Sequence, residues 1–435
     1  MNSQLKKTVI LGAMFPLAVC GEIDPIALLN QARAKIVENI GRLPKYTCVQ
    51  SVHRSRFEAI PAIQVKDCAY VQDPEIEPRL MLSWADRFKL DVTVSEGAEM
   101  FSWVGARSFQ SKDVDQIVGG GMTGTGDFGP FLISIFSGKG SEYRYLGPQQ
   151  ERGRTLAVYS YGVPLAFSGY QVKVGPRPED TSTMAYEGKF WIDPESAELS
   201  RLTIEVPNPP RHARMCRVET TIDYGRTAMG GFDFLLPRLT VLKMWDAEAE
   251  RSENKIEYSS CREFQTESVF RTDLDPSAGN SATPQKPVAI PPGLTIKIVL
   301  RSKIDSDSSF AGDAIEGQLL NAIRVHGSVL APAGAIAHGR IVRFERHLQP
   351  SSYFEMGLKF DSVEVNGSEV PLILQAVPLS KGDRILADPL ETRQGVGIFM
   401  FQSDRFTLDR KFVSEWKTQK QEAAVRRQKS EDGSR

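Results

Sequence analysis

The stretch YEGKFWIDPESAELSRLTIEV, residues 186–206, contains two segments of strand length separated by a short turn. Asp193-Pro194-Glu195-Ser196 supplies the residue types that favour a tight turn between them. A parallel pair would need a long crossover between its strands, and no such segment fits here. The stretch therefore predicts two consecutive antiparallel strands.

The same pattern extends outward over most of the first 265 residues. Between residues 88 and 94, Phe, Leu and Val alternate with Lys, Asp and Thr, which is the period of a half-buried strand. We predict a long antiparallel meander, broken only by a short helical region around residues 112–138. Further strand-length segments are TLAVYSYGV (155–163), GYQVKV (169–174), CRVETTIDY (216–224), PRLTVLKMW (237–245) and KIEYSSCREF (255–264).

One helix precedes the meander, in DPIALLNQARAKIVENIGRLP, residues 24–44. Asp24 is a good N-cap and Pro25 suits the first helical position, while Gly41 and Pro44 favour termination. The helix is expected to rest on the sheet through an apolar face formed by Ile26, Leu29, Ile36 and Ile40.

A second all-β block follows a change in composition. Residues 272–287 are rich in Ser, Pro, Gly and Asp, which indicates a flexible linker after a first domain at residues 21–271. Residues 288–418 again alternate, and Asn366-Gly367 predicts a hairpin. We expect a small β-barrel there, and a disordered tail at residues 419–435, which have no apolar face to bury.

The first 20 residues predict export. A basic start is followed by an apolar run of about a dozen residues, which suits a secretory signal and is too short to span a bilayer. Two endings stay open: lipid attachment at Cys20, or ordinary cleavage nearby. Membrane contact is expected only through such a lipid, and we expect a periplasmic or outer-membrane-associated protein.

Four cysteines remain after Cys20, and an even number in an exported chain predicts disulfides. Three pairings are open. We favour the one that joins neighbours in sequence, Cys48 with Cys68 and Cys216 with Cys261. Because the sequence has no CxxC or HxxxH spacing, a metal site is not expected.

GTGDFG, residues 124–129, fits the dinucleotide pattern G-x-G-x-x-G letter for letter. That pattern needs a buried strand before it and a long crossover helix after it, and the flanking sequence offers neither. We therefore expect no cofactor. We interpret Gly124, Gly126 and Gly129 as the hinge of a short apolar lid formed by Phe131, Leu132, Ile135 and Phe136.

Other chemistry-bearing patterns are missing from the sequence. It has no Walker A loop, no G-x-S-x-G elbow and no H-E-x-x-H, so we predict no catalytic residues. Basic and acidic residues nearly cancel (53 against 54), which gives no reason to expect nucleic acid. Aromatic residues recur through the meander, as either an ordinary core or the wall of an apolar groove. The groove candidates are Phe101, Trp103, Tyr159, Tyr161 and Trp191.

The helix, the meander and the segment FGPFLISIF together resemble the outer-membrane lipoprotein-sorting family, which includes LolA, LolB and RseB, over residues 22–265. The resemblance implies an antiparallel half-barrel with an N-terminal helix and a helical lid. IPPGLTIKIVL (290–300) and LAPAGAIAHGRI (330–341) resemble the TrbI-type β-barrel module, which implies a scaffold without enzymatic activity. The combination resembles exported two-domain proteins of soil bacteria.

These features predict a mainly β, non-enzymatic envelope protein whose half-barrel binds a lipid, an acyl chain or a lipoprotein. One alternative is an interaction module that contacts other envelope proteins and has no ligand cavity. The other is a hydrolase of cell-wall or polysaccharide substrates, which would need carboxylates gathered in a cleft.

Overall fold

The computed structural model describes residues 24–60, 67–73, 78–95, 98–106, 114–138, 140–151, 153–173, 180–207, 209, 215–263, 290–377 and 395–420. The predicted signal sequence with Cys20, the predicted linker and all of the predicted tail beyond residue 420 lie outside these ranges.

The N-terminal helix α1 (Pro25–Arg42) forms as the sequence predicts. The side chain of Asp24 accepts hydrogen bonds from the main-chain N–H groups of Ile26 and Ala27, and Pro25 opens the helix. The buried face differs from the predicted one, because Leu28, Ala32 and Ile36 point into the core while Ile26 is 73% exposed. Leu29 and Ile40 are partly buried beside these three residues. The contact face of the helix therefore follows positions i, i+4 and i+8, counted from Leu28, and is rotated relative to the predicted face.

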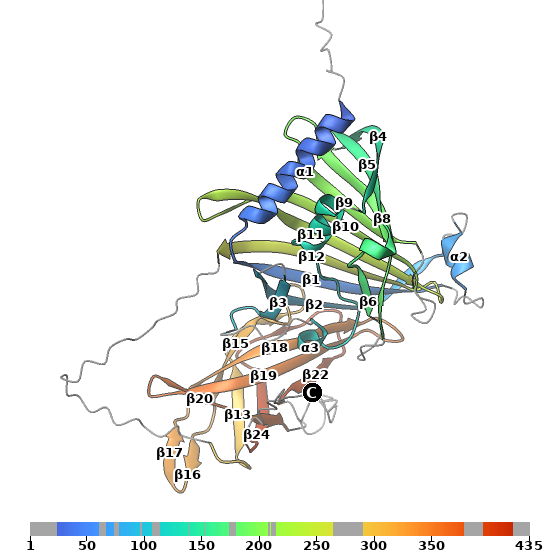
Figure 1. Ribbon diagram of the computed structural model, residues 1–435. Coiled ribbons are helices and arrows are strands. Elements are labelled where there is room, and N and C mark those ends of the chain that lie inside the picture. The colour runs from blue at the N-terminus through green and yellow to red at the C-terminus, as the bar shows by residue number, and fades with distance from the viewer. Residues whose placement is uncertain are drawn as a thin grey trace, which may run out of the picture.

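A single antiparallel meander forms the N-terminal part, which confirms the predicted fold class. Helix α1 crosses this sheet (Figure 1) and packs on residues from its middle strands. Each strand pairs with the next in space, in the order β4 (Glu142–Glu151), β5 (Arg154–Val163), β8 (Tyr186–Asp193), β9 (Glu198–Val206), β10 (Met215–Met229), β11 (Phe232–Asp246), β12 (Arg251–Glu263), β1 (Tyr46–Ala59), β2 (Leu80–Ser95) and β3 (Ala98–Trp103).

The hairpin of β8 and β9 is the stretch 186–206. Its turn is fixed by the Asp193 carboxylate, which accepts the main-chain N–H groups of Glu195 and Ser196. Apolar residues of both strands, among them Phe190 and Leu202, then face the same core. Local turn chemistry and alternation thus suffice to define this pair.

A short helical break interrupts the meander where the sequence predicts one. The break around residues 112–138 contains α3 (Asp115–Val118), α4 (Pro130–Leu132) and a π-helical turn at Ile133–Ser137. The sequence did not predict α2 (Cys68–Gln72) or the 3-10 turn at Leu165–Phe167. β6 (Gln171–Lys173), predicted as a strand of the meander, instead pairs with β7 (Thr181–Thr183) in a separate two-stranded sheet.

The C-terminal part is a second antiparallel series. The predicted hairpin at Asn366-Gly367 is present, with both residues at positive φ between β19 and β20. Neighbouring strands run in the order β22 (Gly397–Phe401), β19 (Tyr353–Val365), β18 (Ile336–His347), β15 (Ala314–Leu319), β13 (Thr295–Leu300), β24 (Val413–Thr418) and β21 (Leu374–Ala376), and β20 (Ser368–Pro371) also pairs with β19. Two small pairs complete it, β14 (Ile304–Asp305) with β23 (Thr407–Leu408) and β16 (Ile323–Val325) with β17 (Ser328–Ala331). The resemblance to the TrbI-type module and the domain boundaries stay predictions.

The two parts of the chain share one sheet, a contact that the sequence did not indicate. Strand β2 pairs with β3 along its second half, whereas its residues Trp84–Asp86 pair with β18. Next to this, the Lys89 N–H donates to the Ala311 carbonyl over 2.7 Å. The buried core also runs through the junction, because Phe88 and Leu90 belong to the same apolar cluster as Phe344 and Phe360.

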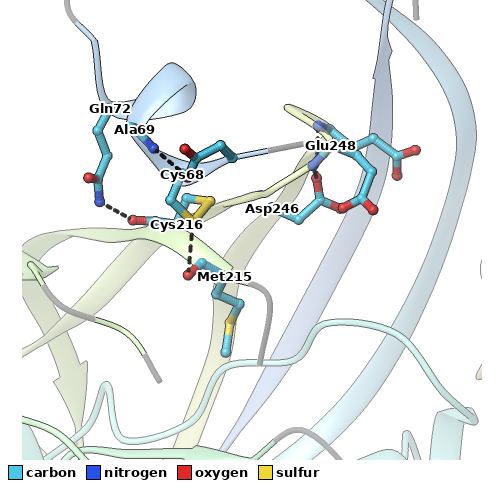
Figure 2. The surroundings of a disulfide bond; sticks show 9 residues. Cys68, Ala69, Gln72, Met215, Cys216, Asp246 and Glu248 are labelled. Atoms are coloured by element: carbon cyan, nitrogen blue, oxygen red, sulfur yellow. Dashed lines mark hydrogen bonds between the residues drawn. A yellow bond between two sulfur atoms is a disulfide. The ribbon is translucent and has the colours of Figure 1, made fainter. Parts of the chain in front are cut away.

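The cysteines pair differently from the favoured prediction. Cys48 is bonded to Cys261 and Cys68 to Cys216, with Cα–Cα distances of 4.0 and 4.9 Å. The first pair forms because β1 lies beside β12 and brings residues 213 positions apart into register. The second forms because α2 packs against β10 (Figure 2). Closeness in sequence was the wrong criterion, because long-range strand pairing decides which cysteines meet.

Candidate functional site

A cavity of about 1150 Å³ lies between the sheet and the glycine loop, residues 119–129. Strand β11 contributes Thr240, Leu242 and Met244, which share one face because side chains alternate along a strand. The apolar part of the lining comes from six segments of the fold. Its members are Phe101, Val114, Met122, Pro130, Phe131, Val172, Met215, Val218, Leu242, Met244 and Ile256.

The predicted lid packs beside this cavity. Leu132, Ile135 and Phe136 are each at most 2% exposed and belong to the core of the half-barrel. Phe131 lines the cavity and stacks on Tyr170, with ring centroids 5.7 Å apart. The lid segment therefore fills part of the half-barrel and forms one wall of the space that remains.

The predicted hinge glycines differ in what they contribute. Gly124 and Gly126 line the cavity, and only Gly126 has a positive φ, of +103°. A Cβ at Gly126 would lie 3.2 Å from the ring of Phe131. Gly129 has a φ of −165°, which any residue adopts, and a Cβ there would meet nothing within 4 Å.

A carboxylate from β3 fixes the glycine loop. Glu99 accepts hydrogen bonds from the main-chain N–H groups of Gly126, over 2.9 Å, and Phe128, over 3.4 Å. Asp127, between them, points into the core and accepts a hydrogen bond of 2.5 Å from the Tyr258 hydroxyl. Both residues are part of the cavity lining.

Burial changes the protonation of these two acids. It raises the pKa of Asp127, and burial together with the nearby Asp127 charge raises the pKa of Glu99 to about 7. Neutral tyrosines complete the surroundings, since burial raises the pKa of both Tyr224 and Tyr258 well above the usual value.

The start of the glycine loop rests on a buried ion pair. Arg54 on β1 binds the Asp86 carboxylate of β2 and donates to the Gly120 carbonyl over 3.0 Å. A Cβ at Gly121 would lie 2.6 Å from the Arg54 guanidinium, so the close approach requires glycine. The loop is thus held at both ends, by Arg54 and by Glu99.

The far end of the lining lies at the turn between β11 and β12. The Asp246 carboxylate accepts the N–H groups of Glu248 and Glu250, and the Glu250 carboxylate binds the Arg56 guanidinium. Figure 2 shows Asp246 and Glu248 near the Cys68–Cys216 disulfide, whose first sulfur contacts the Met215 carbonyl. This disulfide therefore lies close to the charged end of the cavity.

The structure brings one of the five groove candidates to the cavity. Phe101 lines it, while Trp103 packs in the core shared with the C-terminal part. Tyr159 and Tyr161 pack against the lid and Phe190, and Trp191 lies in a small cluster with Leu156 and Val158. These four are core residues, as the alternative interpretation of the aromatics proposes.

Several lining residues were missed from the sequence. Asp127 lies inside GTGDFG, and Met244 alternates with Leu242 on β11, so both carried a local signal. Glu99 carried none, because its role depends on β3 and the glycine loop meeting in space. Within the described ranges no cluster of three or more His, Cys, Asp or Glu side chains is arranged to hold a metal ion.

No described helix is long and apolar enough to cross a membrane. No protein-family model matches the sequence, and no curated protein matches it significantly. Solved structures do match, over 54 to 55% of this chain. One is a DUF1329 family protein from Desulfovibrio piger, with 9% identity, 93% of its own chain covered and a TM-score of 0.25.

Two further matches are a lipoprotein-sorting domain and a LolA superfamily protein. A domain from Vibrio parahaemolyticus, described as an outer membrane lipoprotein-sorting protein, shares 12% identity over 92% of its chain, with a TM-score of 0.25. A LolA superfamily protein from Nitrosomonas europaea shares 10% identity over 94% of its chain, with a TM-score of 0.23. At these values the similarity concerns the fold alone.

Proposed function

We propose that this protein is a non-enzymatic, exported envelope protein whose half-barrel cavity binds an amphiphile through its acyl chain, as a free lipid or as the lipid of a lipoprotein. The cavity of about 1150 Å³ carries this proposal. Small-molecule sites usually measure about 300–1000 Å³, so the space suits a long, flexible ligand.

The character of the wall supports an acyl chain. Met122, Met215 and Met244 line the cavity together with Phe101 and Phe131. Methionine side chains adapt to irregular apolar shapes, and aromatic rings offer large apolar areas. Removing apolar ligand surface from water contributes roughly 25 cal/mol per Å², which needs no catalytic apparatus.

Export is supported by the two disulfides, because such bonds persist in oxidising compartments. The signal sequence and lipid attachment at Cys20 lie outside the described residues and stay predictions. Peptide mass spectrometry of the N-terminus of the protein from an envelope fraction tests both.

The binding test is the uptake of N-phenyl-1-naphthylamine, a neutral fluorescent probe, followed by native mass spectrometry of protein purified from an envelope. Met244→Trp fills the cavity and should abolish probe uptake. Lys243→Trp is the matched control, since Lys243 is on the opposite face of β11 and should leave uptake unchanged. Absence of both probe uptake and co-purifying lipid would refute the proposal.

A second candidate, hydrolysis of a polysaccharide, is favoured by one observation. Glu99 and Asp127 both line the cavity, and the pKa of Glu99 is raised by burial to about 7, in the range of a general acid. Against it, the Glu99 carboxylate already accepts two main-chain N–H groups. Release of reducing sugar from cell-wall material, lost in Glu99→Gln, would favour this candidate over the first.

A further inference from the structure

The charges around the cavity are strongly unequal. Six lining side chains carry carboxyl groups and two are basic, Arg56 and Lys173. Arg56 is already hydrogen-bonded to Glu250. The space therefore has a negative excess even when Glu99 is protonated. The six acids are Glu99, Asp115, Asp127, Asp246, Glu248 and Glu250.

A buried hydroxyl that makes no hydrogen bond of good geometry lies at the inner end of this space. Thr240 is 2% exposed and lines the cavity beside the Asp127 carboxyl. Its Oγ1 faces the Asp127 carboxyl and the Tyr258 hydroxyl, but makes no hydrogen bond of good geometry to any described residue. Buried hydroxyls are normally satisfied, and leaving one unpaired is unfavourable. The Thr240 hydroxyl is thus a group that a bound molecule can satisfy.

Polar and apolar lining residues follow one another along one face of β11. Thr240 is followed on the same face by Leu242, Met244 and Asp246. At about 3.3 Å per residue, the apolar pair occupies the middle of a run of roughly 20 Å between two polar ends. A chain placed along Leu242 and Met244 brings its head group to Thr240 and Asp127.

An anionic head group is poorly matched to that end. It would meet Asp127 as a like charge in a partly desolvated space, where repulsion is stronger than in water. It would also bring no hydrogen to the carboxyl oxygens or to Thr240. A hydroxyl, an amide or an ammonium group donates to both.

We infer that the ligand is an acyl-chain amphiphile whose head group donates hydrogen bonds and carries no negative charge, held at the inner end of the cavity by Asp127 and Thr240. This inference rests on the proposed function and specifies its ligand class. Free fatty acids and anionic phospholipids are then excluded as preferred ligands.

The test compares three ligands with the same chain length, each competing with bound N-phenyl-1-naphthylamine on the mature protein. Dodecylamine supplies an ammonium, N-dodecanoylethanolamine supplies an amide and a hydroxyl, and dodecanoate supplies an anion. The first two should displace the probe at concentrations at least about tenfold below that of dodecanoate, as expected for a close like-charge contact. The ratio between the first two identifies which donor the site prefers.

Variants locate the head group. Asp127→Asn should reduce the preference for dodecylamine over dodecanoate to less than about threefold. Thr240→Val, which keeps the shape of the side chain, should weaken displacement of the probe by N-dodecanoylethanolamine. Asp223→Asn is the control, because this β10 carboxylate pairs with Arg201 and is not among the lining residues of the described chain. Thermal unfolding of each variant establishes that it is folded.

The outcomes separate the two proposals. Equal or tighter displacement by dodecanoate overturns the head-group inference and leaves acyl-chain binding standing. Unchanged selectivity in both folded variants overturns the assignment to Asp127 and Thr240. Failure of the wild type to take up the probe or any of the three ligands refutes the proposed function itself.

Discussion

The main-chain N–H of Gly126 donates a 2.9 Å hydrogen bond to the carboxylate of Glu99, which ties the C-terminal end of the glycine loop to β3. The bond joins a glycine with a positive φ to a carboxyl group whose pKa burial raises to about 7. The loop that covers the cavity is therefore fixed by a group that titrates near neutrality.

Stability should depend on pH through Glu99. Its pKa is raised by burial from 4.5 to about 7, so the folded state holds this proton more tightly than the unfolded state. The contribution of Glu99 is therefore fully present below about pH 4.5 and is lost as the pH rises through 7. Urea unfolding over this interval should show a falling free energy of unfolding.

Glu99→Gln is the matched variant for that experiment. In this variant the free energy of unfolding should fall less steeply with pH, by at most about 1.4 kcal/mol per pH unit. Asp127 keeps its own raised pKa and contributes with the same sign in both proteins. Identical slopes for wild type and variant would contradict the assignment to Glu99.

The glycine loop makes a second prediction, in which two predicted hinge residues should behave differently. Gly126→Ala should destabilise the protein by about 1–3 kcal/mol, because alanine is strained at a φ of +103° and its Cβ would press on Phe131. Gly129→Ala should change stability by less than about 0.5 kcal/mol. Thermal unfolding of the two variants checks this, and equal effects would show that backbone conformation does not distinguish them.

Non-reducing peptide mapping should recover Cys48 joined to Cys261 and Cys68 joined to Cys216. Replacing the first pair by serine should lower the free energy of unfolding by about 2–5 kcal/mol, because the bond closes a long loop. Recovery of a Cys48–Cys68 peptide as the main product would contradict the pairing of β1 with β12.

The shared sheet predicts coupled unfolding of the two parts of the chain. The Arg87 guanidinium on β2 donates to the carbonyls of Ser306 and Asp307, over 2.6 and 2.9 Å, and lies over the ring of Phe344. Arg87→Ala should cost about 2–4 kcal/mol, since it leaves the part-buried carbonyls of Ser306 and Ser309 without this donor. It should also split one urea transition into two.

The control for that experiment is Arg144→Ala, at an exposed position on β4. It should leave a single transition and an unchanged midpoint. Two separate transitions in the wild type would contradict the coupling itself.

Local sequence patterns were sufficient to predict individual helices and strands. They were insufficient to predict which strands pair with each other. Asp24, Pro25 and the alternation around Phe88 predict α1 and β2, because capping and side-chain period act within a few residues. The pairing of β2 with β18 joins residues about 260 positions apart, and no local pattern encodes it.

The same limit applies to the candidate site. Phe131 and the glycines were identified because GTGDFG stands out in the sequence. The contact of Asp127 with Tyr258 spans 131 residues, and the cavity wall is assembled from several strands in this way. Of the five groove candidates only Phe101 reaches the wall, since aromatic residues serve a β core equally well.

The two nested disulfides have a consequence for the order of events during synthesis. Cys48 and Cys68 emerge first from a chain delivered N-terminus first, long before Cys216 and Cys261. Early oxidation would join these two neighbours, which is not a native bond. The chain must then either delay oxidation until β12 has been delivered, or reshuffle the early bond by thiol–disulfide exchange. Removing disulfide isomerase activity should therefore slow the maturation of those chains in which the early bond has formed.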